Sequence, residues 1–143
     1  MNSIEAFSHF FPGIAAQETR SYVLETHTGK LAPGTYFFTD AYCTDKECDC
    51  RVGYITVIKE GAPSKELARI TFGWEPLSFY CRWMGVSIPD AEIIALKGPA
   101  LMWLAPQTPA ANELLSVFGQ AVSNDPGYVH LLKNHYTIFK EKT

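Results

Sequence analysis

The stretch TYFFTDAYCTDKECDCRVGYITVIK, residues 35–59, contains two β-strand patterns separated by a short polar segment. Residues 35–42 and 51–59 are rich in β-branched and aromatic side chains, which favour an extended backbone. The second of these segments is apolar on both faces, as is typical of a central strand that is covered on both sides. The TDKE segment between them is turn material, so the pattern predicts a hairpin in the middle of a sheet.

Further strands are expected before and after this hairpin. Residues 20–26 precede residues 35–42, and the intervening GKLAPG is a turn sequence, so these two segments are expected to pair. Residues 67–74 alternate between apolar and polar side chains, which indicates a strand with one face toward the core. The first half of the chain therefore predicts an antiparallel sheet.

Helices are expected in the second half of the chain, at residues 76–84, 109–122 and 126–140. Thr108 and Asp125 are good N-cap residues, and each precedes a proline, which fits the first turn of a helix. Residues 86–104 have no clear pattern, and EIIALKG within them fits either a strand or an irregular connection. We expect one α+β domain over residues 1–143, with an antiparallel sheet from the N-terminal half and helices from the C-terminal half packed on one face.

Composition limits the classes of partner. The 143 residues include 47% hydrophobic side chains, with 15 acidic against 12 basic residues and a net charge of −3. This balance makes nucleic acid an unlikely partner class, because it provides no general attraction to phosphate. The start of the chain lacks the features of a signal peptide, and no apolar run is long enough to cross a membrane. We expect a soluble, cytoplasmic protein with no membrane partner.

Three of the four cysteines lie at the tip of the predicted central hairpin. Cys43 ends one strand, whereas Cys48 and Cys50 precede the next and share a face of extended chain. Thiols stay reduced in the cytoplasm, where clustered cysteines more often bind metal or act in redox chemistry than form disulfides. Zn²⁺ prefers tetrahedral thiolate and imidazole ligands, so the C-x4-C-x-C spacing predicts a zinc site.

A closed tetrahedral site needs a fourth ligand, and there are two candidates. His135 lies on the apolar stripe of the last predicted helix and therefore points inward. Cys81 lies on the predicted helix over residues 76–84. Either residue is also suited to simple core packing.

The pattern YC-x4-CDCR before a strand, PQTPAANELL at the start of a helix, and a closing HYTIF resembles a group of small bacterial proteins of unknown function. The resemblance covers about the last hundred residues. It implies that Cys43, Cys48, Cys50 and His135 act together, and leaves Cys81 outside the set. It implies no activity.

The sequence contains none of the common local motifs for phosphate binding, nucleophilic serine chemistry or metalloprotease chemistry. A zinc ion with three thiolate ligands is a poor Lewis acid, which favours a structural role. We therefore expect a zinc-binding domain that serves as a binding or interaction module for a protein or small-molecule partner. Two alternatives remain open, namely a metal-dependent hydrolase and a thiol redox sensor that uses the clustered cysteines.

Overall fold

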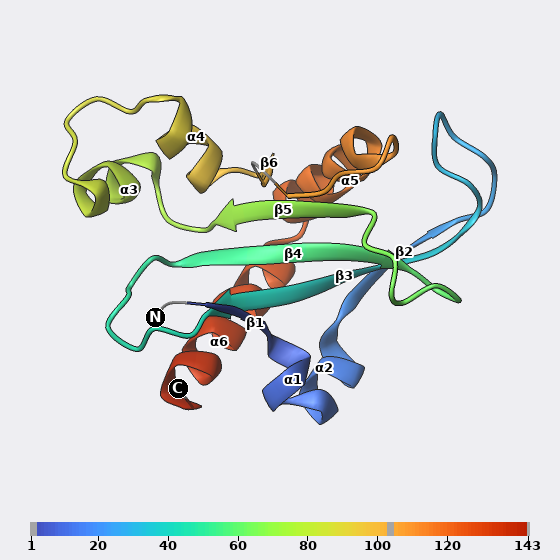
Figure 1. The fold of residues 1–143 in the computed structure, drawn as a ribbon, viewed down its shortest axis with the longest axis horizontal. Coiled ribbons are helices and arrows are strands. Elements are labelled where there is room, and N and C mark those ends of the chain that lie inside the picture. Colours follow the sequence, from blue (N-terminus) through green and yellow to red (C-terminus); the bar gives the residue numbers. More distant parts are fainter. Residues whose placement is uncertain (1–2, 103–104, 143) are drawn as a thin grey trace.

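A six-stranded antiparallel sheet forms the middle of the computed structural model, which describes residues 3–102 and 105–142 (Figure 1). The strands run in the order β1-β3-β4-β5-β6, and β2 also pairs with β3. Their bounds are β1 (Ile4–Ala6), β2 (Arg20–Leu24), β3 (Gly34–Cys43), β4 (Val52–Lys59), β5 (Ala68–Gly73) and β6 (Ala100–Leu101). The antiparallel α+β class predicted from the sequence is confirmed.

The predicted pairing of the strands is also confirmed. β3 and β4 form the central hairpin, in which Asp40 lies opposite Ile55. β2 pairs with the first half of β3, and β1 pairs with its last three residues, so that Ile4 lies opposite Cys43. Both therefore lie along the edge of β3 that faces away from β4.

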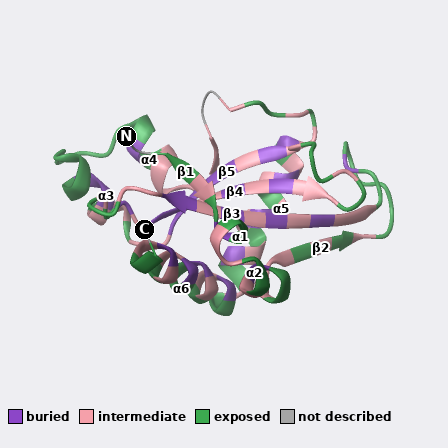
Figure 2. Cartoon of the chain, turned by 60° about the horizontal axis from the view of Figure 1, so that its bottom comes forward, coloured by how far each residue is buried: buried purple, intermediate pink, exposed green. Residues whose placement is uncertain are grey.

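Six helices accompany the sheet in the described part of the chain. They are α1 (Phe7–Phe10), α2 (Pro12–Glu18), α3 (Leu77–Met84), α4 (Ala91–Lys97), α5 (Ala111–Asn124) and α6 (Pro126–Lys142). The main core lies between α5, α6 and the sheet face that carries Phe38 and Phe72, and both of these rings meet Phe118 of α5 edge-on. Figure 2 shows that buried and exposed residues alternate along α6, as expected for a helix with one face against a sheet.

The pair α3–α4 lies beyond β5, at the end of the sheet where β4 begins (Figure 1). A second cluster of buried side chains lies here, with Tyr80 and Cys81 from α3, Ile93 from α4, and Cys43 and Cys50 from the hairpin. The tip of the central hairpin is thus packed against a helical excursion and is not a free loop.

The structure also resolves the segment that had no clear sequence pattern. EIIALK lies in the helix α4, so the expectation of a strand or an irregular connection is wrong. Asp90 is the N-cap, because its carboxylate accepts a hydrogen bond from the Ile93 N–H at 2.9 Å. Gly98 follows the helix. The last two residues of the segment, 103–104, lie outside the described residues.

The two expected N-caps differ in outcome. Asp125 accepts a hydrogen bond from the Tyr128 N–H at 3.2 Å, and α6 begins at Pro126 as predicted. The N-cap at Thr108 is wrong, because α5 begins at Ala111. The Thr108 hydroxyl instead donates to the Leu67 carbonyl at 2.7 Å, and this bond holds the chain before α5 against the start of β5.

Candidate metal centre

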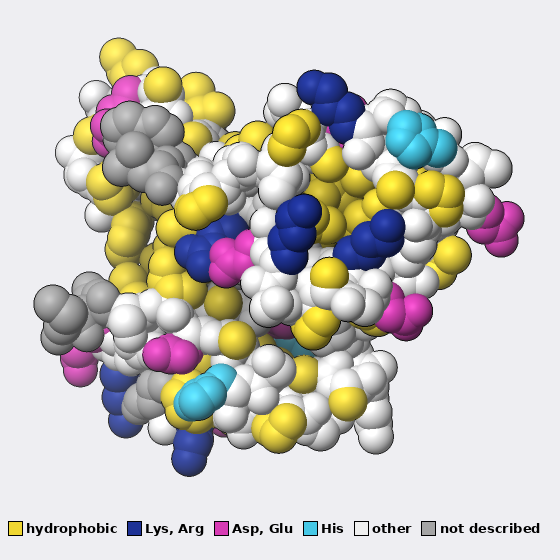
Figure 3. Space-filling model, turned by 45° about the vertical axis from the view of Figure 1, so that its right-hand side comes forward, with side chains coloured by type: hydrophobic (Ala, Val, Ile, Leu, Met, Phe, Trp, Pro, Cys, Tyr) yellow, Lys and Arg dark blue, Asp and Glu magenta, His cyan; other side chains and the backbone are white. Residues whose placement is uncertain are grey.

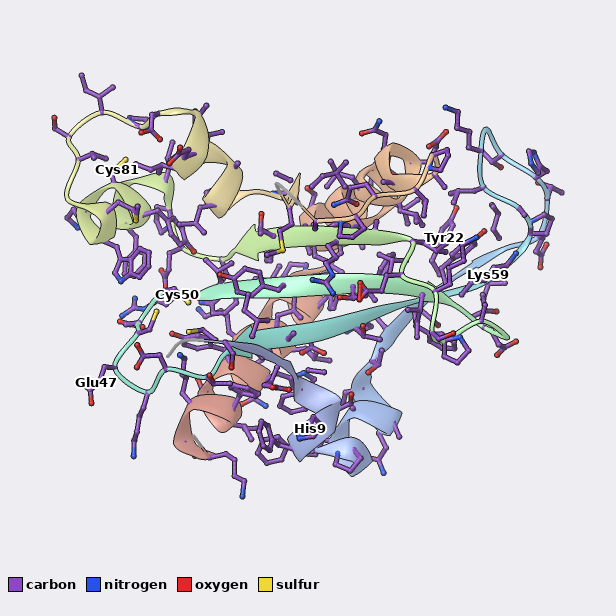
Figure 4. The ribbon with its side chains drawn as sticks, viewed as in Figure 1. His9, Tyr22, Glu47, Cys50, Lys59 and Cys81 are labelled. Carbon is purple, nitrogen blue, oxygen red and sulfur yellow. The ribbon has the colours of Figure 1, made fainter. Side chains whose placement is uncertain are left out.

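The three clustered cysteines lie on and beside the loop of residues 44–51, which joins β3 to β4 (Figure 4). Cys43 and Cys50 are buried, whereas Cys48 is half-buried. The Cys48 thiol lies close enough to the Cys43 and Cys50 thiols for both to raise its pKa. The structure therefore brings together the three sulfur atoms that the sequence places at the hairpin tip.

The environment of the Cys48 thiol disfavours its thiolate form in the absence of a cation. Burial raises the pKa of Cys48 to about 12, and the neighbouring Cys50 and Cys43 raise it in the same direction through charge and hydrogen bonds. The pKa of the Tyr54 phenol is also raised, first by burial and then by the charges of the three neighbouring cysteines. A bound soft cation would instead favour the thiolate form, because thiolates are the ligands that it prefers.

The backbone of the loop is held in place by three long side chains from other elements. The Lys140 ammonium of α6 donates to the carbonyls of Cys43 and Asp45, at 2.9 and 2.7 Å. The Tyr136 hydroxyl accepts from the Arg51 N–H at 3.3 Å, and the Tyr80 hydroxyl donates to the Arg51 carbonyl at 2.8 Å. The loop that carries Cys48 and Cys50 is thus fixed by α6 on one side and by α3 on the other.

Arg51 connects the loop to the α3 side of the protein. Its backbone has a φ of 51°, in the left-handed region that non-glycine residues rarely adopt. Its guanidinium makes two hydrogen bonds to the Asp49 carboxylate, at 2.9 and 3.0 Å, and a third to Glu75 at 3.2 Å. It also lies 4.5 Å from the centre of the Phe79 ring. The unusual backbone at Arg51 turns the chain from the thiol loop into β4.

His135 occupies a different site from the one expected. The side chain is fully buried, with Nδ1 2.7 Å from the Asp40 carboxylate and Nε2 2.8 Å from the Glu18 carboxylate. The Phe7 ring stacks on the imidazole at 3.9 Å. Neither ring nitrogen is free to bind a metal, and the structure does not bring His135 to the cysteines.

The reason for this difference is the two-residue period of β3. Asp40 and Tyr42 point to the face of the sheet that α6 covers, whereas Cys43 points to the opposite face. An inward-facing residue of α6 therefore meets Asp40 and not Cys43. Asp40 and Glu18 were not recognised from the sequence, although an acidic residue on the buried side of an aromatic strand indicates a buried partner of opposite charge.

The ring nitrogens of His135 face two carboxylates, which act only as acceptors when ionised. With both carboxylates ionised, both nitrogens donate and the ring is an imidazolium. Burial lowers the pKa of His135, but hydrogen bonds to Asp40 and Glu18 and the charges of both outweigh burial, so that the pKa is raised. The group is a buried ion-pair network, completed by the Tyr42 hydroxyl, which lies 2.6 Å from the same Asp40 oxygen.

Cys81, the other candidate for the fourth ligand, is buried in the same apolar cluster as Cys43 and Cys50. Its thiol is not among the groups that perturb Cys48. Figure 4 shows Cys81 on α3, apart from Cys50 at the start of β4. Within residues 3–102 and 105–142, no group of three or more His, Cys, Asp and Glu side chains is arranged so that it could hold a metal ion.

Comparisons of the chain with protein-family models, with curated proteins and with solved structures find no match. Among the described residues, no helix combines the length and the apolar character needed to cross a membrane.

Proposed function

We propose that this protein is a zinc-binding interaction module in which Cys43, Cys48 and Cys50 hold the ion. The observation that carries the proposal is the proximity of the Cys48 thiol to both other thiols, on a loop whose backbone is fixed from two sides. Tetrahedral zinc with Zn–S bonds of about 2.3 Å separates its sulfur ligands by about 3.8 Å, close to thiol hydrogen-bonding distance. Small rotations of the side chains would therefore convert the thiol contacts into a ligand set.

The role of the ion in this proposal is structural. Zinc would fix the loop of residues 44–51. Arg51 of this loop contacts Glu75 and the Phe79 ring through its guanidinium, and its carbonyl accepts a hydrogen bond from Tyr80 of α3. The loop would thus hold the helix pair α3–α4 in place through these contacts. Such a site suits the reducing conditions of the cytoplasm, where thiols remain available to metals.

The outer side of α3–α4 is the surface we assign to a protein partner. Seven large hydrophobic side chains are exposed in the described part of the chain, and five of them lie between residues 83 and 94: Trp83, Met84, Val86, Ile88 and Ile94. Figure 3 shows hydrophobic surface at this projecting end. Exposed apolar side chains that gather in one part of a protein are characteristic of interaction sites.

Neither the metal-dependent hydrolase nor the thiol redox sensor agrees with the geometry as well as a structural zinc site does. A hydrolytic zinc needs an open, electrophilic ion and a nearby general base. Here the ligands are thiolates, and His135 is committed to Asp40 and Glu18. A redox sensor needs a thiol of low pKa, whereas the pKa of Cys48 is raised to about 12.

Metal analysis of the purified protein, paired with thermal unfolding, tests the proposal. We expect one zinc per chain and a loss of both zinc and thermal stability in Cys48→Ser. Cys81→Ser is the matched control and should keep its zinc. A metal-free protein that gains no stability when zinc is added would refute the proposal, as would full zinc content in Cys48→Ser.

A further inference from the structure

A surface hollow lies at the end of the sheet opposite the thiol loop. It has a volume of about 370 Å³ and lies between the segment that joins β2 to β3, the connection from β4 to β5, and the start of α5. Figure 4 places Lys59 at this end of the sheet and Cys50 at the other. The volume is in the range of small-molecule sites, which is roughly 300–1,000 Å³.

Three lysines line this hollow: Lys30, Lys59 and Lys65. None of their ammonium groups forms an ion pair with a carboxylate of the described residues. The Glu113 carboxylate lies nearby, where it accepts a hydrogen bond from the Lys30 backbone N–H at 3.3 Å, but it is not part of the wall. In a chain with a net charge of −3, the hollow is therefore a local concentration of positive charge.

Lys59 is held in position by its neighbours in the sheet. It is half-buried, whereas the other two lysines are exposed. It lies opposite Tyr36 in the β3–β4 ladder, and its ammonium lies 5.6 Å from the centre of the buried Tyr36 ring. Its side chain passes over Gly34, where a Cβ would overlap the Lys59 Cε. One of the three positive charges is thus fixed at the hollow before a ligand arrives.

Much of the remaining wall is apolar. Leu31, Leu67 and Ala110 contribute to it, and all three belong to the main core or pack against it. Figure 3 shows Lys and Arg side chains beside hydrophobic surface on this side of the molecule. A ligand that matches the hollow therefore needs an apolar body as well as negative charge.

We propose that this hollow binds a small phosphomonoester with an apolar body. A phosphate monoester carries a charge of about −1.5 to −2 at pH 7 and three strong acceptor oxygens, which suits three ammonium donors better than a single carboxylate does. Lysines bind phosphate as point charges, and their flexible side chains can turn toward it. The apolar body would cover Leu31 and Leu67, and the removal of this surface from water favours binding.

Calorimetric titration of the intact chain with 1-naphthyl phosphate near neutral pH tests the proposal. We expect one saturable site per chain. 1-Naphthol, which lacks the phosphate, should bind at least about tenfold more weakly, because three exposed ion pairs of roughly two- to fivefold each are lost. Inorganic phosphate, which lacks the apolar body, should also bind more weakly. No binding of 1-naphthyl phosphate, or equal binding of 1-naphthol, would overturn the proposal.

Two double variants separate this hollow from the general charge of the protein, because each removes two positive charges. Lys59→Met/Lys65→Met should weaken 1-naphthyl phosphate about four- to twenty-five-fold, as expected for two ion pairs. Lys46→Met/Lys133→Met, at exposed positions outside the hollow, is the matched control and should change the affinity by less than about twofold. Equal effects of the two double variants would overturn the assignment of the ligand to this hollow.

A further variant tests whether the naphthyl group binds instead to the exposed hydrophobic side chains of α3–α4. Ile88, between these helices, is 78% exposed, and Ile88→Asp should keep the wild-type affinity for 1-naphthyl phosphate. A loss as large as that in Lys59→Met/Lys65→Met would place the ligand at α3–α4 and overturn the proposal. Cys48→Ser should also keep this affinity whatever its zinc content, because the thiol loop lies at the other end of the sheet. This proposal and the zinc site are therefore tested separately.

Discussion

His135 Nδ1 lies 2.7 Å from Asp40 Oδ2, and both side chains are buried between α6 and β3. This pair connects the last helix to the central strand, and the bond from His135 Nε2 to Glu18 extends the connection to α2. Removing one member of a buried ion pair costs about 3–5 kcal/mol, because the other member is left charged and unpaired.

His135→Gln should therefore lower the free energy of unfolding by about 3 kcal/mol or more. In this variant the Asp40 carboxylate would keep the Tyr42 hydroxyl and would gain only the uncharged glutamine amide in place of the imidazole. Urea denaturation at neutral pH measures the change. His130→Gln, at an exposed position of the same helix, should stay within about 0.5 kcal/mol of wild type. A zinc content that falls in His135→Gln under conditions where the protein is folded would instead identify His135 as a ligand.

The same network predicts a pH dependence of stability. The pKa of His135 is raised in the folded state above its ordinary value of 6.5, so the folded protein binds the proton more tightly than the unfolded chain. This stabilisation is fully present below pH 6.5 and is lost as the pH rises through the folded-state pKa. Wild-type protein should lose stability relative to His135→Gln as the pH rises above 6.5 and through the raised folded-state pKa. A difference between the two that is constant over this range would contradict the prediction.

Features that depend on local sequence patterns could be predicted, whereas features that depend on long-range packing could not. The strands β2 to β5, the start of α6 and the crowding of Cys43, Cys48 and Cys50 all follow from local patterns, and the structure contains each of them, whereas the short strands β1 and β6 were not predicted. The helix α4 was not predicted, although Asp90 and Gly98 bracket it as N-cap and C-cap residues.

The partners of His135 depended on which face of β3 meets α6, and this is a long-range property. An inward-facing histidine was recognised, but whether it meets Cys43 or Asp40 is decided by the packing of a helix that lies about ninety residues further along the chain. The alternation of β3 separates the two outcomes, because residues 40 and 43 point to opposite faces. The sequence alone does not say which of these faces the last helix covers.

Zinc affinity should depend steeply on pH, because the thiols must lose their protons to bind the ion. The pKa of Cys48 is raised to about 12, so near neutral pH this thiol is protonated before the metal arrives. Each proton released contributes about a tenfold rise in apparent affinity per pH unit. Competition with a chromophoric chelator from pH 6.5 to 7.5 should show a slope that is smaller by about one proton in Cys48→Ser. A wild-type affinity that is independent of pH would argue against thiolate coordination.

The backbone at Arg51 offers a test of the loop that does not depend on metal. Its φ of 51° costs a residue with a side chain roughly 1–2 kcal/mol, whereas glycine adopts this conformation freely. Arg51→Ala and Arg51→Gly both lose the contacts to Asp49, Glu75 and Phe79. Only Arg51→Ala keeps the backbone cost, so it should be the less stable of the two variants. Arg51→Gly should exceed it in free energy of unfolding by about 1 kcal/mol.

Gly13→Ala and Gly73→Ala form the matched pair for the contact between β5 and α3. A Cβ at Gly73 would overlap the Tyr80 phenol, which donates to the Arg51 carbonyl, whereas a Cβ at Gly13 meets no atom within 4 Å. Gly73→Ala should cost about 1–3 kcal/mol through overpacking, and Gly13→Ala, within α2, should be neutral or slightly stabilising. Because Tyr80 fixes the loop that carries Cys50, Gly73→Ala should also weaken zinc binding. Equal zinc affinity in the two variants would show that α3 does not hold the thiol loop in place.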